Sequence, residues 1–267
     1  MDEGTFHCYA SLIYTHSGIA LGESKKELVK ARVAKRMRAL GIDDYQDYYH
    51  YVIQDPEGKE LALLLDVIST NVTSFFREGD HFDFISSAIK AWYVQGQRKF
   101  RFWSAGCSTG EEPFSLAMTV LESLAGGKAD IKILATDISR QALETARTGV
   151  YEKKKLDQFP VQRDRYFTST GKSRVMVNDP LKHMVIFNYL NLQGKEYPFQ
   201  GPFDAIFCRN VMIYFDDKGR SDIINRFYRL LGPDRYLLVG HAESLIGTVK
   251  GFQYVRPSIY QKQEAMK

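Results

Sequence analysis

Cysteine is scarce in this sequence, and its three copies, Cys8, Cys107 and Cys208, stand far apart. Their odd number and wide spacing fit neither a disulfide framework nor a metal site, so we expect a reducing compartment and no bound metal. No apolar run approaches the roughly 18 residues of a membrane span. The N-terminus carries acids where a signal peptide carries bases. These absences predict a cytoplasmic protein that does not insert into a membrane.

Charge of one sign is not in excess either. The 267 residues include 36 Lys and Arg and 32 Asp and Glu, which gives a formal net charge of +4. A sum this close to neutral says little about partners, so the distribution of charge matters more. Hydrophobic residues make up 44% of the chain, enough to bury the core of one large domain or two small ones.

The first 70 residues carry helical patterns and no strand signal. Apolar residues recur between Val29 and Leu40 at the spacing of one helical face. Gly41 ends that helix, and Asp43 and Asp44 can cap the next one. This part of the chain is therefore expected to form a small all-helical domain.

Strands alternate with helices from about residue 80 onward. The alternation begins with a helix at 82–95 and ends with a segment at 252–263 that resembles an edge strand. Between them the pattern predicts strands at 99–105, 131–137, 203–210 and 236–242, and helices at 112–124, 139–149 and 217–231. Such alternation indicates an α/β domain with a doubly wound, mostly parallel sheet. These folds bind ligands beyond the carboxyl ends of their strands.

Residues 160–190 fit neither pattern. Short β-like pieces, RVMV and HMVIFNYL, lie on either side of the turn residues Asn178, Asp179 and Pro180. We interpret this segment as a small antiparallel hairpin or subdomain inserted into the α/β domain.

Small residues follow the first predicted strand, in the stretch AGCSTG that ends at Gly110. They let the backbone approach a ligand closely. The pattern G-x-x-x-G is neither the fingerprint of dinucleotide-binding folds nor a P-loop. Glu111 and Glu112 come next, at a helix N-terminus that would otherwise attract phosphate. These acids count against NAD and ATP, although they could equally serve only the start of the helix.

Asp137 ends the next predicted strand, ILATD. An acid at this place in a doubly wound fold commonly binds ribose hydroxyls. Its alternative role is to cap the helix that starts near Ser139. A glycine loop followed by a strand-end acid suggests an adenosine ligand without phosphate. S-adenosylmethionine fits, because it carries a ribose, a sulfonium, an ammonium and a single carboxylate.

Four blocks of sequence together resemble a known family. They are TNVTSFFRE (70–78), WSAGCSTGEEPFSLAM (103–118), ATDIS (135–139) and FDAIFCRNVMIYFD (203–216). In order and spacing they are similar to the bacterial chemotaxis receptor methyltransferases of the CheR type, class I enzymes that methylate glutamates of chemoreceptors with S-adenosylmethionine. The flanking segments fit as well, so the resemblance covers nearly the whole chain.

The resemblance implies how the chain is divided. An N-terminal all-helical domain at 1–70 is followed by a linker at 71–79 that contributes to the active site. Residues 80–267 are expected to form the S-adenosylmethionine-binding domain, Rossmann-like and doubly wound, with the β-subdomain at about 160–190.

The resemblance also implies the site residues. Arg77 and Tyr214 match the catalytic positions. The expected cofactor contacts are Asn71, Thr73, Arg77, Gly106, Glu112, Asp137, Asn191, Leu192, Arg209 and Asn210. Asp137 is expected on the ribose, with Asn191 and Leu192 beside the adenine. Asn191 could also be a plain turn residue, and Arg77 could be solvated.

The expected chemistry needs no general base. A glutamate side chain has a reference pKa of about 4.3 and is already ionised near neutral pH. It can attack the sulfonium methyl group if the enzyme positions it in line and excludes water. Arg77 would orient this carboxylate through its planar fork, and Tyr214 would complete the pocket. His241 follows a strand, but we expect it to be structural or at the rim.

Seven Lys and Arg and a single acid lie between Lys25 and Arg38. Such a run is often only a solvated helix face. The resemblance implies that it binds the cytoplasmic helical bundle of a chemoreceptor, which is acidic. The expected substrate-binding bases are Lys25, Arg32, Lys35 and Arg36. Nucleic acid is not expected as a partner, because the net charge is small and no recognition block for it appears.

The loop TSTGKS (168–173) is shorter than the corresponding loop of family members that grip a C-terminal pentapeptide of the receptor. We therefore expect no such tether, and a monomer.

Two other functions stay open: a non-catalytic module that senses the cofactor or acts as a scaffold, and a methyltransferase with another protein acceptor. The presence of Arg77, Asp137, Arg209 and Tyr214 favours an active enzyme over the first of these.

Overall fold

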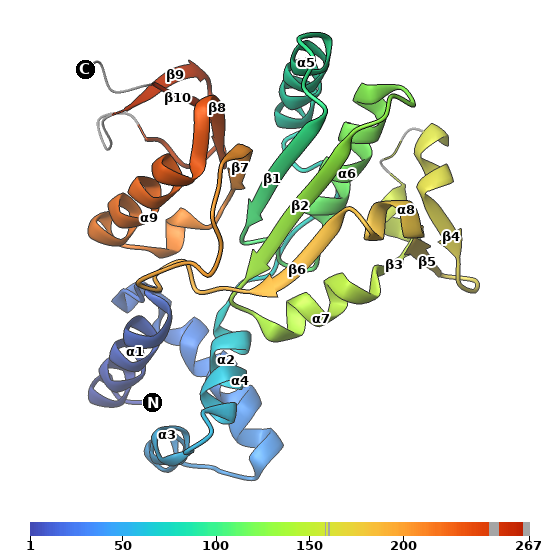
Figure 1. The fold of residues 1–267 in the computed structure, drawn as a ribbon. Helices are drawn as coiled ribbons and strands as arrows, with labels where there is room; N and C mark the ends of the chain where they lie inside the picture. The colour runs from blue at the N-terminus through green and yellow to red at the C-terminus, as the bar shows by residue number, and fades with distance from the viewer. Residues whose placement is uncertain (158, 160, 246–250, 264–267) are drawn as a thin grey trace.

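The computed structural model describes residues 1–157, 159, 161–245 and 251–263. A group of helices from the N-terminal part of the chain lies at the carboxyl ends of a central sheet, which carries further helices on its faces (Figure 1). A second, smaller sheet lies beyond β6, on the opposite side from the C-terminal hairpin (Figure 1). Within the described residues, no helix combines the length and the apolar character that crossing a membrane requires.

The helical domain has one apolar core. Its elements are α1 (Glu3–Ser17), η1 (Glu23–Lys25), α2 (Lys26–Leu40), α3 (Tyr45–Gln54) and α4 (Lys59–Ile68). Asp2 caps α1, since its Oδ1 accepts a hydrogen bond from Thr5 N at 2.7 Å. Gly41 ends α2 in the left-handed conformation, as the sequence predicts. The core includes Tyr9, Ile13, Val33, Tyr48, Leu64 and Ile68.

A buried carboxylate ties α2, α3 and α4 together. Glu60 accepts two hydrogen bonds from the Arg36 guanidinium, at 2.9 and 2.8 Å, and a third from the Tyr48 hydroxyl at 2.7 Å. The Glu60 side chain is 6% exposed and that of Arg36 is 19% exposed. The fork of Arg36 is thus committed to Glu60. The pairing gives Arg36 a part in holding the helical domain together, and its binding of substrate stays a prediction.

The described part of the central sheet has seven strands in the order β6-β2-β1-β7-β8-β10-β9. Their bounds are β1 (Lys99–Ala105), β2 (Asp130–Asp137), β6 (Val185–Tyr189), β7 (Phe203–Cys208), β8 (Leu231–Val239), β9 (Phe252–Arg256) and β10 (Ile259–Lys262). The strands from β6 to β8 are parallel, whereas β10 is antiparallel to both of its neighbours. The order of the chain reverses between β1 and β7, the switch point at which such folds bind ligands.

Helices on the two faces of the sheet bury two cores. The longer ones are α5 (Asp80–Val94), α6 (Glu111–Leu124), α7 (Arg140–Thr148) and α9 (Asp217–Leu230). The first three contribute Ile85, Phe114 and Leu143 to one core. On the other side, Phe227 of α9 packs against Trp103 of β1. Short turns complete this part: η2 (Lys153–Leu156), η3 (Val161–Tyr166), α8 (Asp179–Lys182) and η4 (Met212–Tyr214).

The inserted sheet is antiparallel, as predicted, but its bounds differ from 160–190. Its strands are β3 (Val150–Glu152), β5 (Arg174–Val177) and β4 (Phe167–Ser169), in that spatial order. The piece HMVIFNYL does not belong to it. That piece contains β6, which pairs in parallel with β2 in the central sheet. β6 is an edge strand in which only Val185 is buried, so its local pattern does not reveal the sheet to which it belongs.

The C-terminal segment 252–263 forms a hairpin where one edge strand was predicted. β9 and β10 pair with each other, and β10 also pairs with β8. The chain reverses at Ser258, which adopts a left-handed backbone with a φ of 63°.

Replacing Arg36 by alanine is expected to lower the free energy of unfolding by about 3 kcal/mol, because it leaves the Glu60 carboxylate buried without its cation. Urea denaturation of the full chain, followed by circular dichroism, measures this change. Lys35→Ala, on the exposed face of the same helix, is the matched control and should change stability by less than about 0.5 kcal/mol. Equal effects of the two substitutions would contradict a stabilising role of the buried pair.

Candidate functional site

A cavity of about 400 Å³ lies where the helical domain meets the carboxyl ends of β1, β2, β6 and β7. Every residue predicted to bind cofactor or to act in catalysis lines it: Asn71, Thr73, Arg77, Gly106, Glu112, Asp137, Asn191, Leu192, Arg209, Asn210 and Tyr214. The fold thus brings together residues that are up to 143 positions apart (214 − 71). The role of each residue stays a prediction.

Asp137 is held by backbone amides at the end of β2. Ser108 N donates to Oδ2 at 2.7 Å, and Ser139 N donates to Oδ1 at 2.8 Å. Burial raises the pKa of Asp137, although these hydrogen bonds oppose the shift. The cap of α7 is Ser139, whose hydroxyl accepts a hydrogen bond from Ala142 N at 3.0 Å. Asp137 is therefore not the helix cap, and each of its oxygens can accept a further hydrogen bond.

The glycines after β1 are required by the packing of the protein itself. Gly106 has a φ of 92°, and a Cβ there would lie 2.4 Å from Val211 Cγ2. Gly110 has a φ of 96°, and a Cβ there would lie 2.8 Å from the Tyr151 hydroxyl. From the sequence we interpreted these small residues as a means for the backbone to approach a ligand closely. The structure gives a second reason: the left-handed backbone and the neighbouring side chains leave no room for a Cβ at Gly106 or Gly110.

The two acids at the start of α6 have different surroundings. Glu111 is fully buried, does not line the cavity and pairs with Lys155. Glu112 lines the cavity. Its Oε1 accepts a hydrogen bond from the Ser104 hydroxyl at 2.7 Å, and its Oε2 accepts one from Arg209 at 3.2 Å. Burial raises the pKa of Glu112, while Arg209 opposes the shift. One acid is therefore structural, and the other stands where a cationic ligand group could reach it.

Arg209 follows β7 and carries a buried positive charge, since its side chain is only 2% exposed. Its guanidinium donates to Glu112, to Glu78 Oε2 at 2.9 Å and to the backbone carbonyl of Arg77. Burial alone would raise the pKa of Glu78, but the charge and hydrogen bond of Arg209 outweigh it and lower the pKa. Arg209, predicted as a cofactor contact, thus also holds the linker and α6 in place.

The linker that carries Arg77 is fixed on both sides of that residue. Phe75 is buried and packs edge-on against the Tyr151 ring, with 4.9 Å between the centroids. Phe76 and Glu78 adopt left-handed backbone, with φ of 50° and 53°. Such a backbone is costly for residues other than glycine and persists only where surrounding contacts enforce it. The half-buried Arg77 side chain therefore stands at the cavity on a fixed turn.

The helical domain closes one side of the cavity. Ala20 N donates to the Tyr214 carbonyl at 2.8 Å, and the Tyr14 hydroxyl donates to Asp216 at 2.8 Å. Tyr214 is half-buried between the two domains, with Lys25 Nζ 5.5 Å from its ring centroid. These contacts connect the segment after β7 to α1 and to the chain that follows it.

Asn191 stabilises a turn through its side chain and also lines the cavity. Its Oδ1 accepts a hydrogen bond from Gln193 N at 2.9 Å, and its amide donates to the His16 carbonyl at 2.9 Å. The neighbouring Leu192 is buried. The loop after β6 is thereby attached to the end of α1.

The basic residues of η1 and α2 differ in what they contact. Arg32 donates to the carbonyls of Ile68 and Ser69 at the end of α4. Like Arg36, it is hydrogen-bonded within its own part of the chain, and its binding of substrate stays a prediction. Lys35 is exposed and Lys25 lies beside Tyr214, so these two remain candidates for a docking surface.

Glu243, in the loop after β8, supports the site without lining the cavity, and sequence reasoning missed it. Its carboxylate accepts four backbone N–H groups, at distances of 2.6 to 3.2 Å. The donors are Gly240, Asn210, Met212 and Ile213. Glu243 thereby fixes the turn that leads from β7 to Tyr214. The available signal was an acid shortly after a predicted strand, but only His241 was considered there.

Glu243→Gln is expected to disturb this turn, because an amide keeps one acceptor oxygen and directs donors at backbone donors. We expect a loss of about 2–3 kcal/mol in the free energy of unfolding. Calorimetric titration should show weaker binding of S-adenosylhomocysteine as well. Glu144→Gln, whose side chain is 75% exposed on α7, is the control and should change neither quantity. Normal stability and affinity in Glu243→Gln would contradict the positioning role.

Family comparison covers both parts of the chain. Residues 5–69 match the family described as "CheR methyltransferase, all-alpha domain", and residues 71–260 match "CheR methyltransferase, SAM binding domain". The two matches meet at residue 70, directly before the linker that carries Arg77.

Curated relatives extend over nearly the whole chain. A chemotaxis protein methyltransferase from Borreliella burgdorferi is 38% identical over 94% of this chain and 91% of its own length. One from Salmonella typhimurium is 38% identical over 97% of this chain and 90% of its own. Both domain matches and both relatives lead to one conclusion: the chain belongs to the CheR methyltransferase family and contains that family's S-adenosylmethionine-binding domain.

Proposed function

We propose that this chain is a protein-glutamate O-methyltransferase that transfers the methyl group of S-adenosylmethionine to chemoreceptors for sensory adaptation. The observation that carries the proposal is the place of Arg77, a half-buried guanidinium on a fixed turn at the cavity of the S-adenosylmethionine-binding domain. A guanidinium can hold a carboxylate through two parallel hydrogen bonds. The names of the relatives support a chemotaxis protein as the acceptor.

The cavity has the size and the donor set for the cofactor. Its volume of about 400 Å³ falls within the roughly 300–1,000 Å³ of small-molecule sites. Asp137 would hold the ribose hydroxyls with its remaining acceptor capacity, and Glu112 would hold the ammonium group. Leu192 would pack beside the adenine. When bound, S-adenosylmethionine supplies an electrophilic methyl group on a sulfonium.

The task of the protein is to position an acceptor that is already reactive. A glutamate carboxylate is ionised near neutral pH, so no residue has to remove a proton. Arg77 would orient the carboxylate towards the methyl group, and the helical domain would keep water out of the cavity. Tyr214 would complete the pocket from the segment after β7. The position of Arg77 and Tyr214 at the cavity supports the tasks proposed for them.

The receptor would be recognised through charge. Lys25 and Lys35 would steer an acidic helical bundle towards the helical domain. The turn between β4 and β5 comprises only residues 170–173. We propose that it is too short to grip a receptor tail, so that a monomeric enzyme acts without the pentapeptide tether. Nucleic acid has no part in this proposal.

Arg77→Lys keeps the charge of the side chain but loses its planar fork. We expect kcat/KM for methylation of a receptor cytoplasmic fragment to fall by about 100-fold, because the acceptor is no longer held in line. Binding of S-adenosylhomocysteine should persist. The assay measures transfer of radiolabelled methyl groups into an alkali-labile ester. Arg229→Lys, exposed on α9, is the matched control with unchanged turnover.

The same assay separates the alternatives. Unchanged turnover in Arg77→Lys would remove this residue from the active site. Label that resists alkali would rule out a glutamate ester and point to a different acceptor group. No transfer by a wild type that binds cofactor would favour a sensing or scaffold module. Receptor fragments with and without their C-terminal five residues should react equally, and a faster reaction of the longer fragment would contradict tether independence.

Asp137→Asn tests the cofactor site separately from the acceptor site. We expect roughly 10- to 100-fold weaker binding of S-adenosylhomocysteine, because hydrogen bonds to a charged acceptor are the stronger ones. Calorimetric titration measures it. Asp43→Asn, exposed in the helical domain, provides the control. Equal affinity of wild type and Asp137→Asn would show that the ribose is bound elsewhere.

A further inference from the structure

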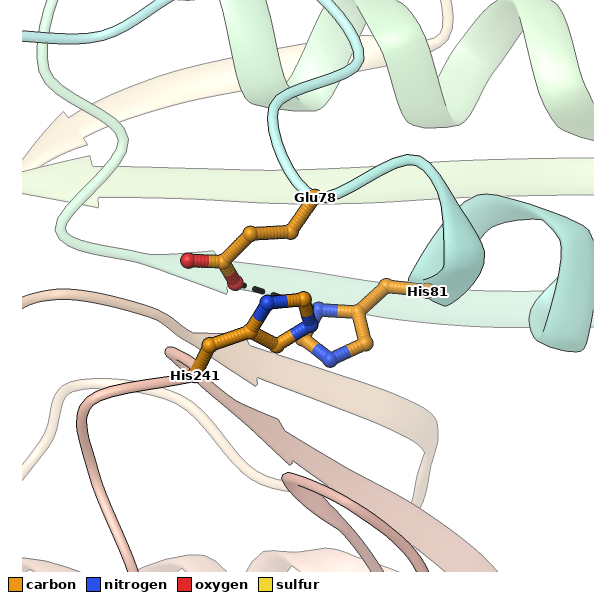
Figure 2. A group of neighbouring side chains, drawn as sticks. All are labelled: Glu78, His81 and His241. Atoms are coloured by element: carbon orange, nitrogen blue, oxygen red, sulfur yellow. Dashed lines mark ion pairs between the residues drawn. The ribbon is translucent and has the colours of Figure 1, made fainter.

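Three metal-ligating side chains meet outside the cofactor cavity. Figure 2 shows Glu78 from the end of the linker, His81 from the first turn of α5 and His241 from the loop after β8 converging from two segments that are far apart in the chain. One ligand atom from each lies within 4.8 Å of the other two. None of the three residues lines the cavity, so the cluster is distinct from the proposed cofactor site.

His81 has no hydrogen-bond partner although it is completely buried. Its exposed fraction is 0%, and neither ring nitrogen is satisfied. The nearest acid oxygen, Glu78 Oε2, lies 3.6 Å from Nδ1, too far for a hydrogen bond. A neutral imidazole has one N–H and one lone pair, and neither finds a partner in the surrounding protein.

His241 is oriented in the way that metal-binding histidines usually are. Its Nε2 lies 3.2 Å from Asp80 Oδ2. A carboxylate at one ring nitrogen fixes the tautomer and leaves the lone pair on the other, here Nδ1. The His241 side chain is 47% exposed, which gives an ion access from solvent and lets the ring adjust.

We propose that Glu78, His81 and His241 bind one divalent transition-metal ion of the Zn²⁺ type, with the fourth position open to solvent. Two imidazoles and one carboxylate form a ligand set that suits Zn²⁺ and not Mg²⁺ or Ca²⁺, which prefer oxygen ligands. Ligands at 2.0–2.1 Å from a tetrahedral ion lie roughly 3.3–3.4 Å apart. The Glu78–His81 separation is already close to this value, and the exposed His241 supplies the remaining adjustment.

A second group of the same residue types provides an internal comparison. Glu3, His7 and Glu23 also gather on the surface of the helical domain. All three are exposed, with His7 Nε2 3.4 Å from Glu23 and 4.0 Å from Glu3. Water can satisfy every one of these groups, so nothing there calls for an ion. His7 is therefore the matched control position.

The carboxylate of Glu78 connects the proposed metal site to the cofactor cavity. Glu78 also accepts a hydrogen bond from Arg209, which binds Glu112 and the Arg77 carbonyl. A dication competes with Arg209 for this carboxylate. Zn²⁺ and S-adenosylhomocysteine should therefore weaken each other's binding, and by the same factor in both directions.

The experiment titrates Zn²⁺ into chelator-treated protein by calorimetry, with wild type, His241→Ala and His7→Ala in parallel. Wild type and His7→Ala should bind one ion with equal affinity. His241→Ala should bind it at least about 100-fold more weakly, since loss of an outer-shell partner alone costs 10- to 100-fold. Asp80→Asn alters this outer-shell partner, and its affinity for Zn²⁺ should lie between those of wild type and His241→Ala. Co²⁺ should give a tetrahedral absorption spectrum in wild type but not in His241→Ala.

Thermal unfolding of each variant shows whether it is folded, and because His241 is half exposed its replacement should keep the fold. The proposal is overturned if wild type binds no Zn²⁺, or if His241→Ala binds it as tightly as wild type. Binding lost in His7→Ala instead would assign the ion to the surface group. None of these results depends on which acceptor the enzyme methylates.

Discussion

The buried guanidinium of Arg209 is the interaction on which the site depends. It lies directly after β7, at the switch point of the sheet, and reaches the linker through Glu78 and the Arg77 carbonyl and α6 through Glu112. A buried charge is tolerated only with such partners, and removal of any one leaves the others uncompensated. The linker, the start of α6 and the end of β7 therefore keep their relative positions as one unit, and the turn held by Glu243 extends that unit to Tyr214.

Two adjacent carboxylates at the junction of β1 and α6 serve two different purposes. Successive residues of a helix project about 100° apart, so Glu111 pairs with Lys155 of the inserted segment while Glu112 reaches the cavity. The positive end of the helix dipole favours both acids. A pyrophosphate would have met repulsion here, whereas an ammonium group meets attraction. The orientation of these two residues, with Glu112 at the cavity, therefore favours a cationic ligand group over a phosphate.

The local sequence pattern was enough to predict the bounds of elements that depend only on neighbouring residues. β1 was predicted at its observed bounds because its apolar run is compact and is followed by turn residues. The sheet to which β6 belongs was not predictable, because its pairing with β2 joins segments that are far apart in the chain. Nor does the sequence of α2 reveal which base meets the buried acid Glu60, or that the ring nitrogens of His81 find no hydrogen-bond partner. Those facts depend on which elements become adjacent in space.

The left-handed turn around Arg77 has a consequence for the order in which the protein acquires function. Phe76 and Glu78 hold an unfavourable backbone that survives only while Phe75 is packed against the inserted sheet and Arg209 is in place after β7. All of these partners come later in the chain than the linker itself. A nascent or partly unfolded chain therefore cannot hold Arg77 in its place at the cavity, and this part of the cavity wall forms only together with the completed α/β domain.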